Sequence, residues 1–219
     1  MTRLVADAVL FDMDGTLVDS TAVVEAVWTE FAAANDADVS SVLAFGHGRP
    51  SRDTIARFAA DSARVEEWSA WITTAEGARF AGVIAIPGAV DAVRSLATDR
   101  WAIVTSAIRL PALERLAQAG FPTPRVLFSA DDVTQGKPHP EPYLAAASAL
   151  KVDPARCVVF EDATAGIEAG LAAGCTVIAV GDVEADGIAG RIADFTSVSF
   201  SRTSDGALVV DISDSELVR

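Results

Sequence analysis

Positive charge is scarce in this sequence of 219 residues, which carries a formal net charge of −14 and has a pI near 4.4. Surfaces that bind the phosphate backbone of nucleic acids are basic, so this balance argues against a nucleic-acid partner. It does not exclude a small phosphorylated ligand, because a local cation and a few hydrogen-bond donors set the charge inside a pocket. The 17 basic residues include only two lysines, Lys137 and Lys151, so the position of each lysine is informative.

Long apolar runs are lacking as well. Although 51% of the residues are hydrophobic, glycine, proline or charge interrupts every stretch before the roughly 18 residues that a membrane span needs. The start of the chain contains no long apolar segment of the secretory kind, so we expect a cytoplasmic protein that does not bind membranes. The two cysteines, Cys157 and Cys175, each begin an apolar run. This pattern favours buried thiols in a reducing compartment over a disulfide or a metal site.

Short apolar runs rich in Val, Ile and Phe alternate with stretches rich in alanine and leucine. Strands that are covered on both faces have this continuous apolar character, and the stretches between them are typical of crossover helices. The alternation predicts an α/β fold with a doubly wound parallel sheet, whose functional side chains lie at the carboxyl ends of the strands. The expected strands are Ala8–Phe11, Trp101–Val104, Val126–Phe128, Cys157–Phe160 and Thr176–Val180, and the expected helices are Gly88–Ala97, Pro111–Ala119, Pro140–Leu150 and Thr164–Ala172.

The first gap between predicted strands is far too long for one crossover helix. It has a mostly helical pattern, with a loop at Gly46–Pro50 and a return to the core at Pro87-Gly88. We therefore predict two parts, a core made of residues 1–18 and 87–219 and a small helical cap made of residues 19–86. The apolar anchors expected for the cap are Trp28, Phe31, Trp68, Trp71 and Phe80.

The segment after residue 194 contains two strand-like pieces, Thr196–Phe200 and Ala207–Ile212. They flank Ser204-Asp205-Gly206, a sequence whose turn chemistry favours a tight reversal of the chain. We expect this segment to form a hairpin at the edge of the sheet.

The most informative motif is the apolar run Val9–Phe11 followed by Asp12-Met13-Asp14-Gly15-Thr16. Residues two apart in a strand point to the same side, so Asp12 and Asp14 would emerge together where the strand ends. Two carboxylates so close repel each other unless a cation is present, and a hard dication with oxygen ligands, most simply Mg²⁺, resolves the conflict. The pair also suits a carboxylate nucleophile beside a carboxyl acid/base. The alternative is a strand end whose acidic residues only solvate a turn.

This motif resembles the first motif of the haloacid dehalogenase superfamily, and later segments follow in that superfamily's order along most of the chain. The likeness is greatest to its sugar-phosphatase branch, which includes 2-deoxyglucose-6-phosphate and glycerol-phosphate phosphatases. The resemblance implies a Rossmann-like core, a Mg²⁺ cofactor, and hydrolysis of a small phosphate monoester, a sugar or polyol phosphate, through an aspartyl-phosphate. It implies that Asp12 is the nucleophile, that Asp14 is the acid/base, and that Asp12 and the backbone carbonyl of Asp14 bind the metal. Dehalogenating relatives lack an acid at the second position, so Asp14 favours phosphoryl transfer.

Three later segments carry the other site residues that the resemblance implies. Thr105, with Ser106 beside it, matches the phosphate-binding hydroxyl after the second strand, although a Thr-Ser pair alone is more often a helix cap. Lys137 lies in a proline-rich loop that leaves it little freedom, as a positioned charge requires, and its ammonium would neutralise the phosphoryl group and pair with the nucleophile. Asp162 matches the remaining metal ligand, with Glu161 a second ligand or an outer one; the alternative for Asp162 is a helix N-cap.

The loop Gly46–Asp53 resembles the specificity loop of the sugar-phosphatase branch. The resemblance implies that His47, Arg49 and Arg52 face the leaving group, although the register leaves the choice between Arg49 and Arg52 open. A solvated loop is the alternative for either arginine. His139 has no evident partner in the sequence, and we interpret it as part of the loop structure around the predicted active-site lysine.

Two relatives with the same core depend on cap residues that this chain lacks. Phosphonate-cleaving members need a Schiff-base lysine in the cap, but no lysine precedes Lys137. Members resembling β-phosphoglucomutase carry a histidine ten residues after the second motif aspartate, where this chain has Val24, so water is favoured as the final acceptor. A mutase of that type, or a non-catalytic protein that binds phosphosugars, is the alternative function. The expected partner is a small phosphorylated metabolite; the sequence does not determine the oligomeric state, and a monomer is compatible with it.

Overall fold

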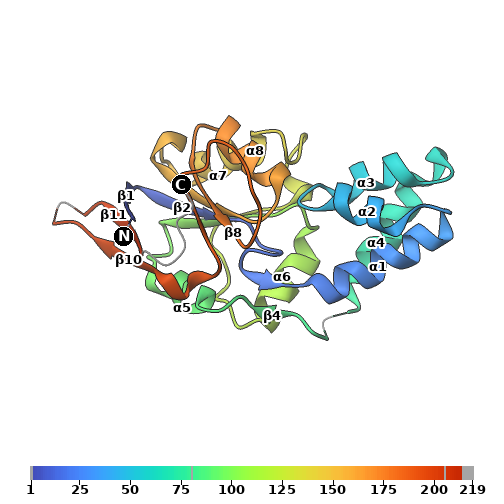
Figure 1. Cartoon of the computed structure of the whole chain (residues 1–219), viewed down its shortest axis with the longest axis horizontal. Helices are drawn as coiled ribbons and strands as arrows, with labels where there is room; N and C mark the ends of the chain where they lie inside the picture. The colour runs from blue at the N-terminus through green and yellow to red at the C-terminus, as the bar shows by residue number, and fades with distance from the viewer. Residues whose placement is uncertain (1, 80, 205, 214–219) are drawn as a thin grey trace.

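A six-stranded parallel sheet forms the centre of the computed structural model, which describes residues 2–79, 81–204 and 206–213 (Figure 1). All five predicted strands are present in it, and one further short strand, not predicted, extends its edge. The predicted doubly wound α/β core is thereby confirmed. In spatial order the strands are β6 (Leu127–Phe128), β5 (Trp101–Val104), β2 (Ala8–Phe11), β7 (Cys157–Glu161), β8 (Thr176–Val180) and β9 (Gly190–Ile192).

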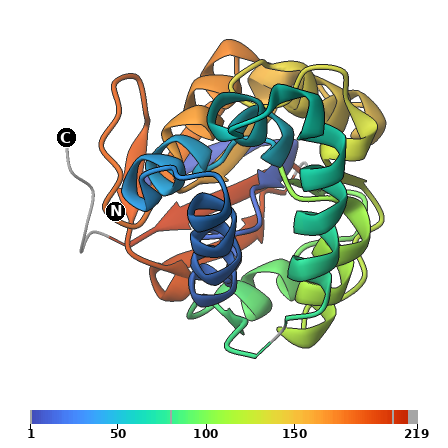
Figure 2. The same ribbon diagram turned by 90° about the vertical axis from the view of Figure 1, so that its right-hand side faces the viewer.

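Helices cover both faces of this sheet, as the two perpendicular views show (Figures 1 and 2). Along β2, Val9 and Phe11 belong to one apolar cluster, whereas Leu10 belongs to a second cluster on the opposite face. Alternate residues of a strand point to opposite sides, so a strand without polar positions is required when both faces are covered. The first face carries α5 (Ala89–Ser95) and α6 (Arg109–Gln118), and the second carries α7 (Glu141–Leu150) and α8 (Thr164–Ala172).

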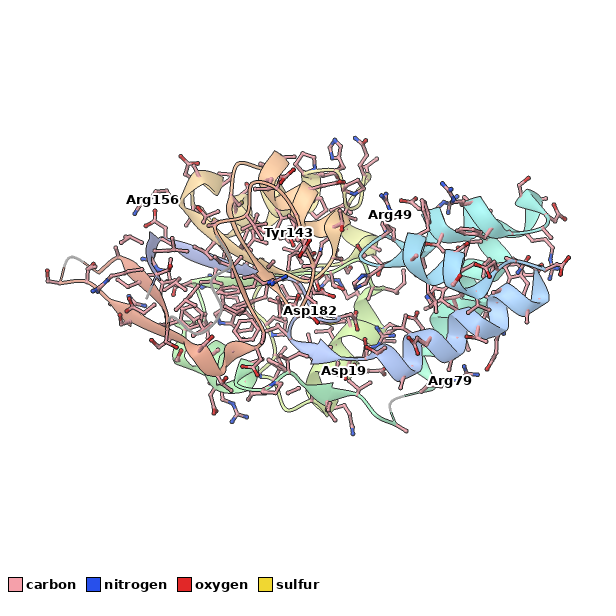
Figure 3. All side chains as sticks on the ribbon, viewed as in Figure 1. Asp19, Arg49, Arg79, Tyr143, Arg156 and Asp182 are labelled. Carbon is pink, nitrogen blue, oxygen red and sulfur yellow. The ribbon has the colours of Figure 1, made fainter. Side chains whose placement is uncertain are left out.

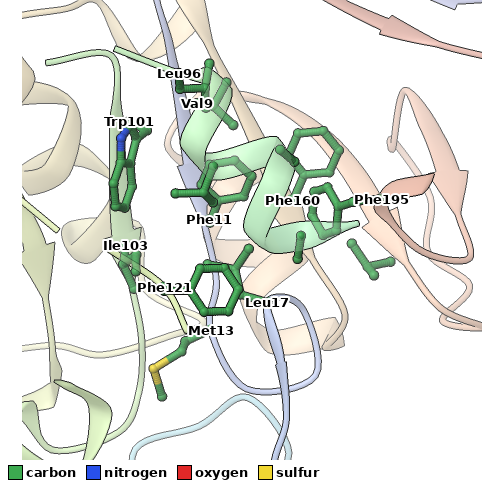
Figure 4. Packing of buried hydrophobic residues seen from close by; sticks show 14 of the residues in the cluster. Val9, Phe11, Met13, Leu17, Leu96, Trp101, Ile103, Phe121, Phe160 and Phe195 are labelled. Atoms are coloured by element: carbon green, nitrogen blue, oxygen red, sulfur yellow. The ribbon is translucent and has the colours of Figure 1, made fainter. Parts of the chain in front are cut away.

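Aromatic packing holds the carboxyl ends of two central strands together. Phe11 at the end of β2 stacks on Phe160 of β7 with ring centroids 5.6 Å apart, and Phe195 packs against both rings (Figure 4). All three side chains are buried, and full burial of a phenylalanine stabilises the fold by about 1.5–3 kcal/mol. The residues that follow these strand ends are therefore held in position by a tightly packed core.

A second, three-stranded antiparallel sheet contains the C-terminal hairpin. Its order is β1 (Thr2–Ala6), β11 (Leu208–Ile212) and β10 (Val198–Arg202). The pairing of β10 with β11 agrees with the prediction, but the placement of the hairpin at the edge of the main sheet is wrong. The reason is β1, which was not predicted: it pairs with β11 along its whole length, from Thr2 opposite Ile212 to Ala6 opposite Leu208. Asp205 of the predicted turn lies outside the described residues.

The helical segment between β2 and β5 has an apolar cluster of its own, which includes Val27, Phe31, Ile55 and Ile72. The chain enters the segment through β3 (Val18–Asp19) and returns through the antiparallel β4 (Ile84–Ala85). The boundaries of the cap, 19–86, stay a prediction. Of its expected anchors, Phe80 lies outside the described residues, while the cluster contains or contacts Trp28, Phe31, Trp68 and Trp71. The described residues of this segment form the α-helices α1 (Thr21–Ala34), α2 (Val39–Gly46), α3 (Ser51–Phe58) and α4 (Val65–Gly77), with a short 3-10 helix at Ser62–Arg64.

The lengths of the helices can be compared with the length that a membrane-spanning helix needs. Among the described residues, the longest helix is α1, with 14 residues. No helix in this part of the chain combines the length and the apolar character needed to cross a bilayer.

Candidate active site

The ends of β2 and β7 bring the acidic motif residues together. Asp12 follows β2, and its backbone N–H donates to the carbonyl of Phe160, 3.0 Å away, on the neighbouring strand. The loop after β2 turns back at Gly15, where φ is +86°. A side chain at this position would begin 1.9 Å from Oδ2 of Asp162, so only glycine lets the loop close over that carboxylate. Gly15 therefore lets the loop that carries Asp12 and Asp14 approach Asp162 closely.

Lys137 lies beneath this cluster with a side chain that is only 1% exposed. Its Nζ donates to Oδ1 of Asp12 and, at 2.6 Å, to Oε1 of Glu161. Burial by itself would lower the pKa of Lys137, but the negative charges of Asp12 and Glu161 outweigh it and raise the pKa above its ordinary value. The ammonium therefore stays charged and holds one oxygen of Asp12 in place.

Glu161 is fully buried, and donors occupy both of its oxygens. Oε1 also accepts from the hydroxyl of Tyr143 at 3.2 Å, and Oε2 accepts from the backbone N–H of Ala163 at 2.9 Å. The carboxylate packs so closely on α8 that a side chain at Gly166 would begin 1.6 Å from Oε1. Burial, together with the charge of Asp162, raises the pKa of Glu161, although Lys137 opposes the shift. Figure 3 shows Tyr143 in the interior of the core.

The three carboxylates form a group that fits a divalent cation. One oxygen from each of Asp12, Glu161 and Asp162 lies within 4.8 Å of the other two. Three carboxylates against a single ammonium leave an excess of negative charge, and burial followed by the charge of Glu161 raises the pKa of Asp12. A hard dication such as Mg²⁺ binds all-oxygen sites of this kind and would offset the excess. Glu161 accepts three hydrogen bonds from buried donors, whereas one of the two partners of Asp162 is the exposed side chain of His47, so Asp12 and Asp162 are better placed to coordinate.

The two predicted phosphate-binding hydroxyls have different surroundings. Thr105 follows β5, is nearly buried, and accepts a hydrogen bond from the backbone N–H of Ala107 at 3.0 Å. Its own proton is thus available for an anion. The hydroxyl of Ser106 instead donates to the carbonyl of Gly48, 2.8 Å away in the loop between α2 and α3. The geometry therefore favours Thr105 as the phosphate donor and makes Ser106 a link between core and helical segment.

Asp14 is held by residues that the sequence did not single out. Its Oδ1 accepts from the hydroxyl of Ser20 at 2.6 Å and from Nη1 of Arg115 at 2.9 Å. Nη2 of Arg115 donates to Oε2 of Glu76 at 2.8 Å. Burial raises the pKa of Glu76, while the charge of Arg115 lowers it and that of Asp14 raises it. An ion network thus joins the predicted acid/base to helices α6 and α4.

The loop between α2 and α3 packs directly on the core. Nε2 of His47 lies 2.9 Å from Oδ2 of Asp162, and this hydrogen bond raises the pKa of His47. A side chain at Gly48 would begin 2.4 Å from Cβ of Ala163, and one at Gly136 would begin 2.2 Å from Cγ of Pro50. Glycine at these two positions therefore lets the loop pack closely against the strand ends.

A cavity of about 420 Å³ lies between these strand ends and the helices. Arg49 lines it, and Figure 3 places this arginine at the junction of the core and the helical segment. Val24 and Trp28 supply an apolar wall from α1. Arg52 is not among the lining residues; it pairs at 2.5 Å with Glu66, and both side chains are exposed. Of the two arginines that the sequence could not separate, the structure brings Arg49 to the cavity.

The family model described as haloacid dehalogenase-like hydrolase matches residues 6–174. This range is most of the chain, and it contains Asp12, Asp14, Thr105, Lys137 and Asp162. The chain belongs to the haloacid dehalogenase-like hydrolases. The family resemblance expected from the motifs is thereby confirmed, and so is the prediction of a hydrolytic enzyme.

Several relatives within the haloacid dehalogenase-like hydrolases are named sugar or polyol phosphatases, which confirms the expected likeness to that branch. Hexitol phosphatase A of Escherichia coli is 41% identical over 175 residues, covering 78% of this chain and 81% of that protein. Glycerol-1-phosphate phosphohydrolase 2 of Saccharomyces cerevisiae is 39% identical over 191 residues, covering 81% and 75%. The crystal structure of CbbY from Rhodobacter sphaeroides in complex with phosphate superposes with a TM-score of 0.72 at 26% identity, covering 87% of this chain and 95% of that one.

Two kinds of residue escaped prediction in this member of the family. Thr16, whose Oγ1 donates to Oδ1 of Asp162 at 3.1 Å, and Ser20 lie in or beside the acidic motif, so their closeness to it was a usable signal. Glu76 and Arg115 lie on helices remote in sequence and carry no such signal. His139, interpreted as loop structure, accepts through Nδ1 from the backbone N–H two residues on, at 3.2 Å, which agrees with that interpretation.

Proposed function

We propose that the chain is a Mg²⁺-dependent phosphatase that hydrolyses a small sugar or polyol phosphate through an aspartyl-phosphate at Asp12. The observation that carries the proposal is the buried contact of Lys137 with Asp12 and Glu161, with Asp162 beside them. Lys137 has no access to solvent and donates to two carboxylates, of which Asp12 lines the cavity. This arrangement orients a carboxylate and neutralises charge, as phosphoryl transfer requires.

In the first half-reaction Asp12 attacks phosphorus. Lys137 binds Oδ1, so the second oxygen of the same carboxylate is the one free to form the bond. As that bond forms, the bond from phosphorus to the substrate alcohol breaks, and Asp14 donates a proton to the departing oxygen. The hydroxyl of Thr105 binds a phosphoryl oxygen, and the ammonium of Lys137, which is held against Asp12, offsets the negative charge of the phosphoryl group.

In the second half-reaction water replaces the protein as the partner of phosphorus. Asp14, now ionised, takes a proton from the attacking water, and the bond between phosphorus and Asp12 breaks to release inorganic phosphate. Both carboxyl groups return to their starting protonation states. Bound Mg²⁺ would neutralise phosphoryl charge during both displacements. The residues that would hold it are Asp12 and Asp162, with the backbone carbonyl of Asp14 as the resemblance implies, while Glu161 stays an outer partner.

The cavity supports a neutral, hydroxylated leaving group. Trp28 offers an apolar surface suited to the C–H face of a sugar or polyol, and Glu25 and Arg49 offer groups that bind hydroxyls. Val24 contributes no acid or base on the wall where mutase relatives have histidine, which favours transfer to water. The names of the hexitol and glycerol-1-phosphate phosphatases support the same substrate class.

The test is release of inorganic phosphate from a panel of hexitol, hexose and glycerol phosphates, with Mg²⁺ and with EDTA. We expect turnover of at least one polyol or sugar phosphate that requires the dication. Substituting Asp12→Asn keeps the side-chain shape and should lower turnover by roughly a thousandfold or more while thermal unfolding shows a folded protein. Acid quenching followed by borohydride reduction should convert a phosphorylated Asp12 into homoserine, detectable by peptide mass spectrometry. Near-native turnover in Asp12→Asn would refute the mechanism.

A further inference from the structure

Arg115 carries a buried charge that the reaction steps above do not use. It lies on α6 of the core, and its side chain is 1% exposed. A guanidinium without access to water is tolerated only when carboxylates accept its hydrogen bonds. Its two carboxylates come from different parts of the chain: Asp14 from the loop after β2, and Glu76 from the last turn of α4.

The contacts of Asp14 divide its two oxygens. Ser20 and Arg115 both donate to Oδ1, at 2.6 and 2.9 Å. Within the described part of the chain, no hydrogen bond reaches Oδ2, and Asp14 lines the cavity with a quarter of its side chain exposed. One oxygen is thereby anchored while the other is left to exchange a proton at the reacting centre.

Glu76 fixes the guanidinium that anchors Asp14. The guanidinium is planar, so a hydrogen bond at Nη2 also sets the direction in which Nη1 donates. Glu76 is 8% exposed and accepts that hydrogen bond at 2.8 Å. It lies within the helical segment, whereas Arg115 and Asp14 lie in the core. The orientation of the acid/base therefore depends on how α4 is seated against α6.

We propose that Arg115 and Glu76 are positioning residues for Asp14. Arg115 holds Oδ1 so that Oδ2 faces the leaving-group oxygen, and Glu76 holds Arg115 in the orientation that does so only while α4 lies against the core. The proposal rests on the proposed function, because it assigns proton transfer to Asp14. The competing explanation is an ion network that only fastens the helices to the core.

The test compares two substrates in a single turnover. The polyol or sugar phosphate that the wild type turns over best in the panel above loses an alkoxide that needs a proton, whereas para-nitrophenyl phosphate loses a phenolate that does not. Glu76→Gln removes the charge and keeps the shape, and Arg115→Lys keeps the charge and removes the fork. In a single turnover we expect both variants to release the sugar or polyol roughly ten- to a hundredfold more slowly and to release nitrophenolate at the wild-type rate, while the steady-state KM for the sugar or polyol phosphate changes by less than about threefold.

Glu30→Gln is the matched control, because Glu30 also pairs with an arginine, Arg79 at 2.8 Å, but the pair is exposed and lies outside the cavity. It should behave as wild type with both substrates. Equal losses for the two substrates, or no loss, would leave the network with a fastening role only and overturn the proposal. Crystal structures of Glu76→Gln and Arg115→Lys give a readout independent of activity, in which an unmoved Asp14 carboxylate also overturns it. A wild-type protein that cleaves no phosphate ester overturns the proposed function instead.

Discussion

Substitution of Lys137 by methionine tests how far the active site is stabilised by one buried charge. The change removes the ammonium and keeps an unbranched side chain of similar length. Two carboxylates lose their partner, Asp12 with a side chain 8% exposed and Glu161 with one that is 0% exposed. Removing one member of a buried ion pair costs about 3–5 kcal/mol, because the remaining charge stays out of water. For a chain of this length each kcal/mol corresponds to about 2–4 °C, so Tm should fall by roughly 6–20 °C.

The size of this loss should depend on pH in a defined direction. Burial raises the pKa of Asp12 and of Glu161 in the folded protein, and Lys137 opposes both shifts. Without Lys137 both pKa values rise further above those of the unfolded chain. A carboxyl group of this kind favours folding below its unfolded pKa, and that contribution is lost as the pH rises through the folded pKa. The deficit of the variant should therefore be largest near neutral pH and shrink towards pH 5.

Urea unfolding in EDTA measures the free energy of unfolding at both pH values without a bound dication. Lys151→Met is the control, because Lys151 is the other lysine of the chain and is exposed. The substitution makes the same exchange of one unbranched side chain for another. We expect the control to stay within about 0.5 kcal/mol of wild type. Equal losses in both variants, or a deficit for Lys137→Met that grows on acidification, would refute the role assigned to this charge.

Further predictions concern the metal and the cavity. Asp162→Ala should raise the Mg²⁺ concentration needed for half-maximal activity and recover part of its activity at high Mg²⁺, whereas Asp12→Asn should not recover; unchanged Mg²⁺ dependence in Asp162→Ala would contradict a ligand role. Arg49→Ala should lower kcat/KM for the preferred polyol phosphate about ten- to a hundredfold, the value of a lost charge-assisted hydrogen bond, and affect para-nitrophenyl phosphate much less. Arg52→Ala should match wild type on both substrates, because Arg52 pairs with an exposed carboxylate outside the cavity.

The strand–helix core could be predicted because its signals are local. Apolar runs such as Ala8–Phe11 and Trp101–Val104 are continuous, and the structure places β2 and β5 over those residues. The separate sheet could not be predicted, because β1 has partners some 200 residues away, and its own alternation of half-buried and exposed residues is short and weak. Pairing across such a sequence distance leaves no trace in a local pattern.

The residues of the candidate site likewise fall into those with a local signal in the sequence and those without one. Asp12, Asp14 and Asp162 stand at the ends of apolar runs, and Lys137 stands in an unusual proline-rich loop, so each carries a local signal. Arg115 resembles any other helical arginine in the sequence. The packing of α6 against the loop after β2 brings it to Asp14, and the packing of α4 against α6 brings Glu76 to it. Both contacts are properties of the folded chain.

The burial of both thiols would let dyes attached elsewhere report whether the helical segment moves relative to the core. Cys157 is 1% exposed and Cys175 6%, and the chain has no other cysteine. Thiol-reactive dyes would therefore meet little background in the native protein. Ser40 on α2 and Ser199 on β10 are exposed, and Ser→Cys is nearly isosteric at each. With a donor dye at one of these positions and an acceptor dye at the other, energy transfer would measure the distance between α2 and β10. Adding inorganic phosphate would then show whether the distribution of that distance becomes narrower.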